Sequence, residues 1–180
     1  MAMKKRLFIA IDLPGKIKER IVRLQNNLKT EAPRATWVKP ENLHLTLIFL
    51  GNTDYSQIPE IISTLSQLKD DAFEITFWDI GGFPNQNRAE IIFLGIKENL
   101  ALNYLQGKIR ERLEKLNLRI DDKKFVPHLT LARLKRPKKM MRIKFDTNIG
   151  NFPAKEFILY ESELYQEGPK HTLMKKFSLI

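Results

Sequence analysis

The sequence predicts an α+β protein with two similar lobes, each holding a sheet and one or two helices, that face each other across a central cleft. The tetrapeptide His-Leu-Thr-Leu occurs twice, at His44–Leu47 and at His128–Leu131, 84 positions apart. A strand-like segment begins 37 residues before each copy, near Leu7 and near Ile91, and a helix-like segment lies between. This repeated strand–helix–strand order indicates an internal duplication and a pseudo-symmetric fold.

Strand and helix patterns alternate through the first half of the chain. Apolar runs and alternating segments that end at turn residues predict its strands: Leu7–Leu13 before Pro14, His44–Leu50 before Gly51, and Phe73–Ile80 before Gly81–Gly82. Apolar residues three and four positions apart predict two helices, the second capped by Asp54. Their buried stripes are Ile17, Ile21, Leu24 and Leu28, and then Ile58, Ile61, Ile62, Leu65 and Leu68.

The second half repeats the same order and then adds a tail. A strand is expected at Glu90–Ile96, and a helix is expected from the stripe Leu102, Leu105, Ile109, Leu113 and Leu116. A charged turn, Asp121–Lys124, leads into the strand that begins at His128. The tail predicts a basic turn at Arg133–Lys139 and a hairpin formed by Phe157–Tyr165 and His171–Leu179.

We expect one bilobal domain, 1–180, because the length suits a single large domain or two small lobes. The seam is expected at Gly81–Arg88, which is rich in glycine, asparagine and proline, so that the lobes span about 1–85 and 86–180. Terminal strands are free to exchange between the lobes. The sequence does not determine the oligomeric state, and a monomer is our working expectation.

Composition narrows the setting in which the protein works. Cysteine is absent, which excludes a disulfide framework and a cysteine-based zinc site and fits a reducing, cytoplasmic location. The first apolar stretch is short and is interrupted by Asp12, so it resembles a strand and not a signal peptide. No segment approaches the roughly 20 apolar residues that a membrane-spanning helix needs. We therefore expect no membrane partner.

The chain carries a net charge of +10, from 31 basic and 21 acidic residues. An excess of this size favours a partner that bears phosphate groups, such as a nucleic acid, because basic side chains neutralise phosphates and release counterions. A lysine-rich surface that serves solubility or heat adaptation is the alternative interpretation. Charge alone does not name the ligand.

The two tetrapeptides suggest paired acid–base chemistry. On a strand, His and Thr two positions apart point to one face while the leucines point to the other. His44 with Thr46 and His128 with Thr130 would therefore surround one small site. An unperturbed imidazole titrates near pH 6.5, so one ring can act as the base while the other acts as the acid. The threonine hydroxyls can donate to phosphate oxygens.

Arg133 is a candidate for a bidentate phosphate contact. Its odd offset from His128 and Thr130 places it on the leucine side of a regular strand, so it reaches the cleft only where the strand twists, bulges or ends. A solvated or paired surface charge is the alternative. We expect neither a metal nor another cofactor, because two histidines are too few ligands and no acidic residue stands at a metal-binding spacing.

These residues resemble the two-histidine (2H) phosphoesterase superfamily and, within it, the RNA 2′,3′-cyclic phosphodiesterases, also called 2′-5′ RNA ligases. The resemblance rests on the paired His-x-Thr-x motifs. It extends to the opening Leu-Phe-Ile-Ala-Ile-Asp-Leu-Pro, to Phe125–Arg133 and to Tyr160-Glu-Ser-Glu-Leu. It implies two antiparallel sheets that line a cleft, with helices outside. It also implies metal-independent hydrolysis of RNA 2′,3′-cyclic phosphate ends, tRNA fragments among them, to 2′-phosphates.

The resemblance also implies roles for individual residues. His44 would protonate the 3′-oxygen and His128 would activate water, although nothing in the sequence itself separates the two rings. With an RNA 5′-hydroxyl as the nucleophile, the same site would form a 2′-5′ linkage. Thr46 and Thr130 would hold the phosphate. Phe49 is expected either in the hydrophobic core or stacked on a base.

Relatives often carry a tyrosine where this chain has His171, so any contact at that point stays open. Two alternatives to the RNA-end phosphoesterase also remain. One is a non-catalytic module that binds RNA or nucleotides, and the other is a phosphodiesterase that acts on small cyclic nucleotides. Two titratable rings argue against the first alternative, and the net charge favours a longer RNA over the second.

Overall fold

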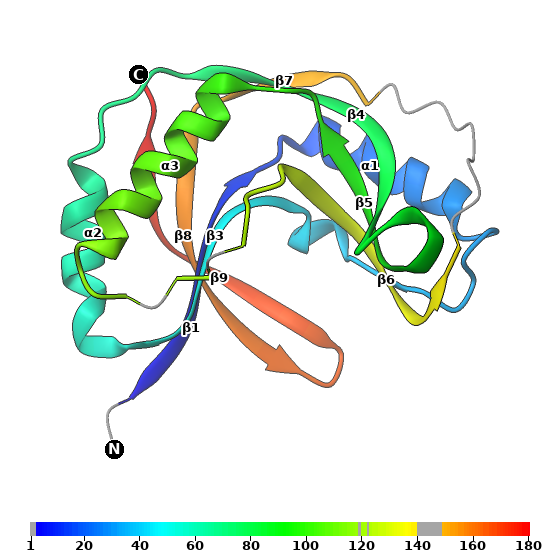
Figure 1. Cartoon of the computed structure of the whole chain (residues 1–180), viewed down its shortest axis with the longest axis horizontal. Helices are drawn as coiled ribbons and strands as arrows, with labels where there is room; N and C mark the ends of the chain where they lie inside the picture. Colours follow the sequence, from blue (N-terminus) through cyan, green and yellow to red (C-terminus); the bar gives the residue numbers. More distant parts are fainter. Residues whose placement is uncertain (1–2, 119, 122, 140–148) are drawn as a thin grey trace.

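Two antiparallel sheets form the framework of the protein in its computed structural model, which describes residues 3–118, 120–121, 123–139 and 149–180 (Figure 1). The four-stranded sheet has the order β3-β1-β8-β9 and the five-stranded sheet the order β2-β6-β5-β4-β7. The strands are β1 Lys4–Asp12, β2 Thr36–Trp37, β3 His44–Asp54, β4 Phe73–Phe83, β5 Ala89–Ile96, β6 His128–Lys138, β7 Asn151–Ala154, β8 Glu156–Tyr165 and β9 Gly168–Ser178. The predicted fold class is confirmed.

The duplication is visible in the strand pairing. β1 pairs with β3 in the first sheet and β5 pairs with β6 in the second, both antiparallel. Thr46 lies opposite Ala10, and Thr130 lies opposite Phe93 at the matching place in the other half. Each sheet also takes strands from the other half of the chain, because β8 and β9 extend the first sheet and β2 the second.

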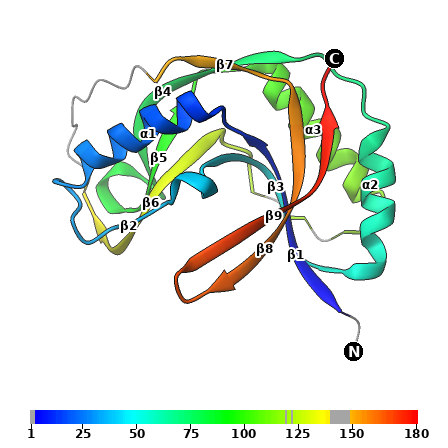
Figure 2. The same ribbon diagram turned by 180° about the vertical axis from the view of Figure 1, so that it is seen from behind.

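Three α-helices cover the sheets on their outer sides (Figures 1 and 2). They are α1 Gly15–Leu28, α2 Ile58–Ser66 and α3 Leu100–Glu114. Although α1 follows β1, it packs on the second sheet, where the Gln25 amide donates 3.0 Å hydrogen bonds to the carbonyls of Val38 and Leu131. Both α2 and α3 lie against the first sheet, with α3 in contact with β3 and α2 in contact with β9. Of these helices, α1 and α3 are thus exchanged between the two halves, whereas α2 stays with the sheet of its own half.

Most of the apolar stripes predicted for the helices are buried, whereas Ile62 and Leu116 are only partly buried and Leu116 lies beyond the end of α3. In α1 the buried stripe residues are Ile17, Ile21, Leu24 and Leu28, and in α3 they are Leu102, Leu105, Ile109 and Leu113. All eight belong to one continuous core that also includes the leucines of both tetrapeptides. In the part of the chain that the structure describes, no helix is long and apolar enough to cross a membrane.

Two predicted strand ends are wrong because glycine allows the strand to continue. Gly51 has φ +63° and sits beside a register shift, and β3 runs on to Asp54. At Gly81, β4 passes so close to the Phe93 ring that a Cβ would lie 2.2 Å from it. Only glycine fits there, and the strand continues to Phe83. The expected seam at Gly81–Arg88 therefore lies within the β4–β5 hairpin of a single sheet.

Two further details differ from the expectations. Asp54 ends β3 and precedes a 3-10 turn, Tyr55–Gln57, without a side-chain capping hydrogen bond, and α2 begins only at Ile58. The expected basic turn at Arg133–Lys139 is mostly strand. β6 continues through Lys138, which pairs with Ala89, because β5 offers it an antiparallel partner.

Candidate active site

β3 and β6 carry the two His-x-Thr pairs and contact each other. Their burial follows the same order from the histidine onward: half-buried, buried, half-buried, buried, buried and exposed. Each histidine and threonine therefore lies on the open face of its sheet, and each pair of leucines lies in the core, as predicted. The sixth position is Phe49 in β3 and Arg133 in β6.

A β-bulge in each strand explains the two consecutive buried residues. The register shifts between Thr46 and Ile48 in β3 and between Thr130 and Ala132 in β6. A bulge inserts one residue and reverses the alternation beyond it. Arg133 therefore returns to the face of His128 despite its odd offset.

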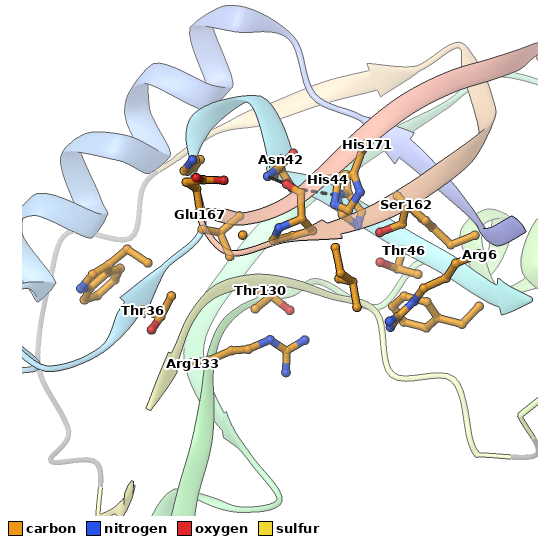
Figure 3. Close-up of a pocket in the computed structure, with 18 of the residues that line it drawn as sticks. Arg6, Thr36, Asn42, His44, Thr46, Thr130, Arg133, Ser162, Glu167 and His171 are labelled. Atoms are coloured by element: carbon orange, nitrogen blue, oxygen red, sulfur yellow. Dashed lines mark hydrogen bonds between the residues drawn. The ribbon is translucent and has the colours of Figure 1, made fainter. Parts of the chain in front are cut away.

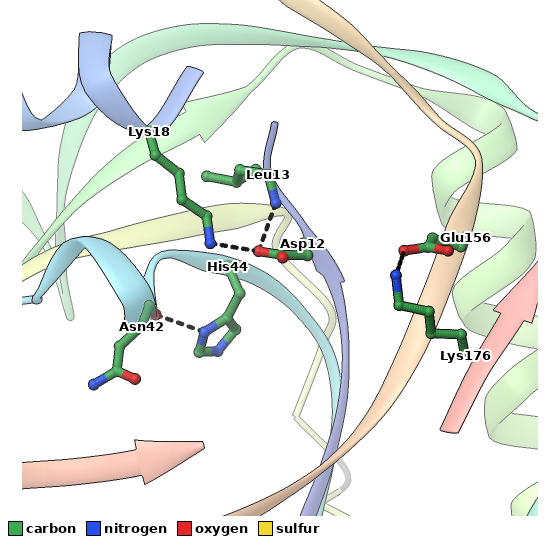
Figure 4. Close-up of polar contacts among 7 residues, drawn as sticks. All are labelled: Asp12, Leu13, Lys18, Asn42, His44, Glu156 and Lys176. Carbon is green, nitrogen blue, oxygen red and sulfur yellow. Dashed lines mark hydrogen bonds and ion pairs between the residues drawn. The ribbon is translucent and has the colours of Figure 1, made fainter. Parts of the chain in front are cut away.

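The two imidazoles are held by matching hydrogen bonds. His44 Nδ1 lies 2.7 Å from the carbonyl oxygen of Asn42 (Figure 4), and His128 Nδ1 lies 2.7 Å from that of Val126. Because a carbonyl oxygen only accepts, Nδ1 must carry the proton in both rings. Each neutral ring therefore has its lone pair at Nε2, which is the atom available for proton transfer.

Aromatic rings pack against both histidines. The His44 ring lies 4.8 Å from Phe8 and 5.3 Å from His171, measured between ring centroids. The His128 ring lies 4.8 Å from Phe83 and 5.5 Å from Phe93. These contacts orient the imidazoles and remove water from one side of each ring. The sequence did not single out any of these phenylalanines.

Burial sets the protonation of both rings. Burial, and then the neighbouring His171, lower the pKa of His44 from 6.5 to about 4, against the opposing effect of the Asn42 hydrogen bond. Burial also lowers the pKa of His128, where the Val126 hydrogen bond opposes the shift and Arg133 adds to it. In the free protein both rings are therefore neutral near pH 7.

Asp12 and Lys18 complete the charged surroundings of His44. Asp12 lies opposite His44 in the β1–β3 pairing and forms an ion pair with Lys18, with 2.7 Å between Asp12 Oδ1 and Lys18 Nζ (Figure 4). The two charges act on the pKa of His44 in opposite directions. The effects of the two charges on the pKa of His44 therefore partly cancel.

Five of the six predicted site residues line one cavity. This cavity, of about 490 Å³, lies between the two sheets, and Figure 3 shows Thr130 and Arg133 across it from His44 and Thr46. Phe49 is exposed and lines the cavity, so the expectation that it lies in the hydrophobic core is wrong.

His128 lines a second hollow of about 580 Å³. Thr46 and Phe49 line both hollows and so connect them. The six predicted residues therefore surround two adjoining spaces. Asn42 and Val126, whose carbonyls hold the two imidazoles, were not predicted from the sequence, although each stands two residues before its histidine.

Comparisons with known proteins agree with this geometry. The family described as LigT like Phosphoesterase matches residues 11–93 and again residues 94–171, one match for each half of the duplication. The RNA 2′,3′-cyclic phosphodiesterase of Methanocaldococcus jannaschii is 34% identical over 96% of this chain and 99% of its own length. That of Archaeoglobus fulgidus is 32% identical over the same shares. The structure of E. coli LigT complexed with 3′-AMP covers 98% of this chain and 99% of its own, with a TM-score of 0.84 and 26% identity.

The fold and the paired site define a two-histidine phosphoesterase. The chain belongs to the LigT-like phosphoesterase family. The family and the class of enzyme predicted from the sequence are thereby confirmed.

Proposed function

We propose that this phosphoesterase hydrolyses 2′,3′-cyclic phosphates at RNA ends and leaves a 2′-phosphate, with its two histidines as the acid and the base. The observation that carries the proposal is the matched pair of hydrogen bonds that leaves Nε2 of His44 and of His128 free for proton transfer. The activity named for the relatives and the net charge of +10 support RNA as the substrate class.

The proposed reaction displaces the 3′-oxygen from phosphorus. His128 Nε2 takes a proton from water as the water oxygen attacks the phosphorus atom. The bond between phosphorus and the 3′-oxygen breaks, and His44, which has taken up a proton from solvent at Nε2 when the anionic substrate binds, gives that proton to the oxygen. One ring gains the proton that the other loses, so exchange with solvent restores the starting state.

Three side chains are placed to hold the phosphate. Among the residues that the structure describes, neither the Thr46 nor the Thr130 hydroxyl donates to another protein group, so both are free to donate to phosphate oxygens. The Arg133 guanidinium can make a bidentate contact to the same group. Donors placed in this way stabilise the charge that grows on the phosphate oxygens in the transition state.

The substrate itself supplies the charge that makes an acid of His44. The pKa of His44 is about 4 in the free protein, so the ring is neutral before the substrate binds. A phosphodiester anion placed beside the ring favours its protonated form. No three His, Asp or Glu side chains within the described residues converge to hold a metal ion, and the proposal assigns all proton transfer to the histidines.

The same geometry accommodates ligation. The hollow beside His128 adjoins the phosphate site, which is where the attacking group would arrive. An RNA 5′-hydroxyl in the place of water would give a 2′-5′ linkage.

A cytoplasmic location and a monomeric state stay predictions from the sequence.

The test is hydrolysis of a short RNA that ends in a 2′,3′-cyclic phosphate, in the presence of EDTA, by the wild type and by His128→Ala. We expect the wild type alone to form a 2′-phosphate end, as mapped on the product. Binding without turnover by the wild type would support the non-catalytic module instead. Turnover of nucleoside 2′,3′-cyclic phosphates but not of the RNA would move the proposal to small substrates.

A further inference from the structure

Beside the phosphate site, three polar side chains form a row across the first sheet. Ser162 on β8 lies directly opposite His171 on β9. The β1–β8 pairing runs from Leu7–Glu161 to Ala10–Ile158, and one further step in that register places Arg6 opposite Ser162. Arg6, Ser162 and His171 all line the cavity that contains His44 (Figure 3). The row therefore faces the same space as the reacting groups.

The row has donors that the protein itself does not use. Within the described residues, Arg6 makes no ion pair and the buried Ser162 makes no side-chain hydrogen bond. His171 Nδ1 is buried without a hydrogen-bond partner, so only Nε2 of that ring can donate to a ligand. Leaving a buried polar group unpaired costs about 1–3 kcal/mol. Three neighbouring groups with free donors are suited to an acceptor from outside the protein.

Charge identifies the acceptor as an anion. Arg6 lies near enough to His171 to lower the pKa of that ring, second to the effect of burial. The acidic neighbours Glu161 and Glu163 alternate onto the opposite face of β8, and Glu161 is paired with Lys5 at 2.6 Å. Glu167 also lines the cavity, but it lies at the other end, away from Arg6 (Figure 3). Among the residues that the structure describes, no carboxylate pairs with the row.

The row lies next to the catalytic centre without being part of it. The rings of His171 and His44 are 5.3 Å apart and nearly perpendicular. Asn42 connects the two elements, because its side chain donates a 2.7 Å hydrogen bond to the carbonyl of Pro169 while its own carbonyl holds His44. This bond fixes the β8–β9 hairpin, and with it His171, against the strand of the reacting histidine.

We propose that Arg6, Ser162 and His171 form a second anion subsite, which binds the phosphate on the 5′ side of the terminal nucleotide. This inference rests on the proposed function and specifies its substrate. When the cyclic phosphate lies between the histidines, the next phosphate of the RNA is one nucleoside away, and the row occupies the adjacent wall of the same cavity. The enzyme then distinguishes an RNA end from a free nucleoside 2′,3′-cyclic phosphate by this second charge.

The test compares two dinucleotides that end in a 2′,3′-cyclic phosphate and differ only in the internucleotide linkage. One has the natural phosphodiester and the other an uncharged methylphosphonate. A charge-assisted contact of this kind contributes about tenfold or more, so we expect wild-type kcat/KM to be at least ~10-fold higher for the charged dinucleotide. In Arg6→Gln the ratio between the two substrates should fall to within about twofold. Arg6→Lys should keep part of the ratio, and Arg23→Gln, an exposed change on α1, should keep all of it.

Each outcome has a distinct meaning. Equal hydrolysis of both dinucleotides by the wild type would overturn the subsite and leave the proposed function intact. A ratio that survives in Arg6→Gln would place the second anion elsewhere. Binding of the two corresponding 2′-phosphate products, measured by calorimetry, gives the same ratio without turnover. It therefore decides the subsite even where no substrate is hydrolysed, a result that would reject the proposed function alone.

Discussion

Phe49 and Arg133 occupy equivalent positions in the two halves of the fold. Each follows its histidine by five residues, and each is the first exposed side chain beyond a β-bulge. The duplicated framework thus presents an aromatic ring on one side of the cleft and a guanidinium on the other. A flat ring suits a nucleobase, whereas a guanidinium suits a phosphate, so the two positions match the two parts of a nucleotide that the proposed function requires.

Arg133 should be required for activity, and a lysine at the same position should not replace it. Its guanidinium can contact two phosphate oxygens at once, which a lysine ammonium cannot do with the same geometry. We expect Arg133→Ala to lower kcat/KM by about 100-fold and Arg133→Lys to recover little of this. Arg136→Ala on the exposed end of β6, away from both hollows, is the matched control. Full activity of Arg133→Lys would show that only the charge matters.

Much of the fold could be predicted because its signals are local. The spacing of Ile17, Ile21, Leu24 and Leu28 alone determines which face of α1 is buried. Both leucines of each tetrapeptide are buried because strand alternation sends them away from the histidine. Such patterns depend only on a few consecutive residues, so one sequence is enough to find them.

The remaining features depend on contacts between distant segments. Gly81 is a glycine because the Phe93 ring on the neighbouring strand occupies the place of a Cβ, and not because the strand ends there. The bulge that turns Arg133 toward the cleft exists only in its pairing with β5. Arg6 and His171 meet through β8, 165 positions apart in the chain. No local sequence pattern indicates these relationships. Arg133 could therefore be predicted as a candidate site residue but its position in the cleft could not, and Arg6 could not be predicted at all.

The acid and the base can be distinguished by changing the leaving group. A sulfur atom in place of the 3′-oxygen leaves as a thiolate, whose conjugate acid has a pKa near 8.5, so it needs little protonation. We expect His44→Ala and His128→Ala each to lose at least ~100-fold in kcat on the natural substrate. On the 3′-thio substrate, His44→Ala should recover most of its loss and His128→Ala should not. The reverse result would exchange the two roles.

Phe49 and Phe8 should respond differently to truncation, although both rings lie near His44. Phe49 is 55% exposed and Phe8 is 3% exposed. Phe49→Ala should therefore raise KM for RNA by roughly 5- to 50-fold, the effect of losing one stacked base, with little change in stability. Phe8→Ala should lower the free energy of unfolding by about 3–5 kcal/mol because it removes a buried ring that packs against His44 and Tyr160. Urea unfolding alongside kinetics checks both, and a destabilised Phe49→Ala would contradict the cavity role.

The buried state of His44 should make the stability of the protein depend on pH. In the unfolded chain its imidazole titrates near 6.5, whereas in the folded protein its pKa is about 4. As the pH falls from about 6.5 to about 4, the unfolded chain binds a proton that the folded protein does not, so the free energy of unfolding must fall. Above this range the ring is neutral in both states, and below it the ring is protonated in both, so the effect is confined to this interval.

His44 should contribute up to about 3 kcal/mol of this loss. Urea unfolding at several pH values should show a shallower decline for His44→Gln than for the wild type, with the two curves parallel above pH ~7. Curves that stay parallel down to pH 4 would mean that the folded protein protonates His44 as readily as the unfolded chain does.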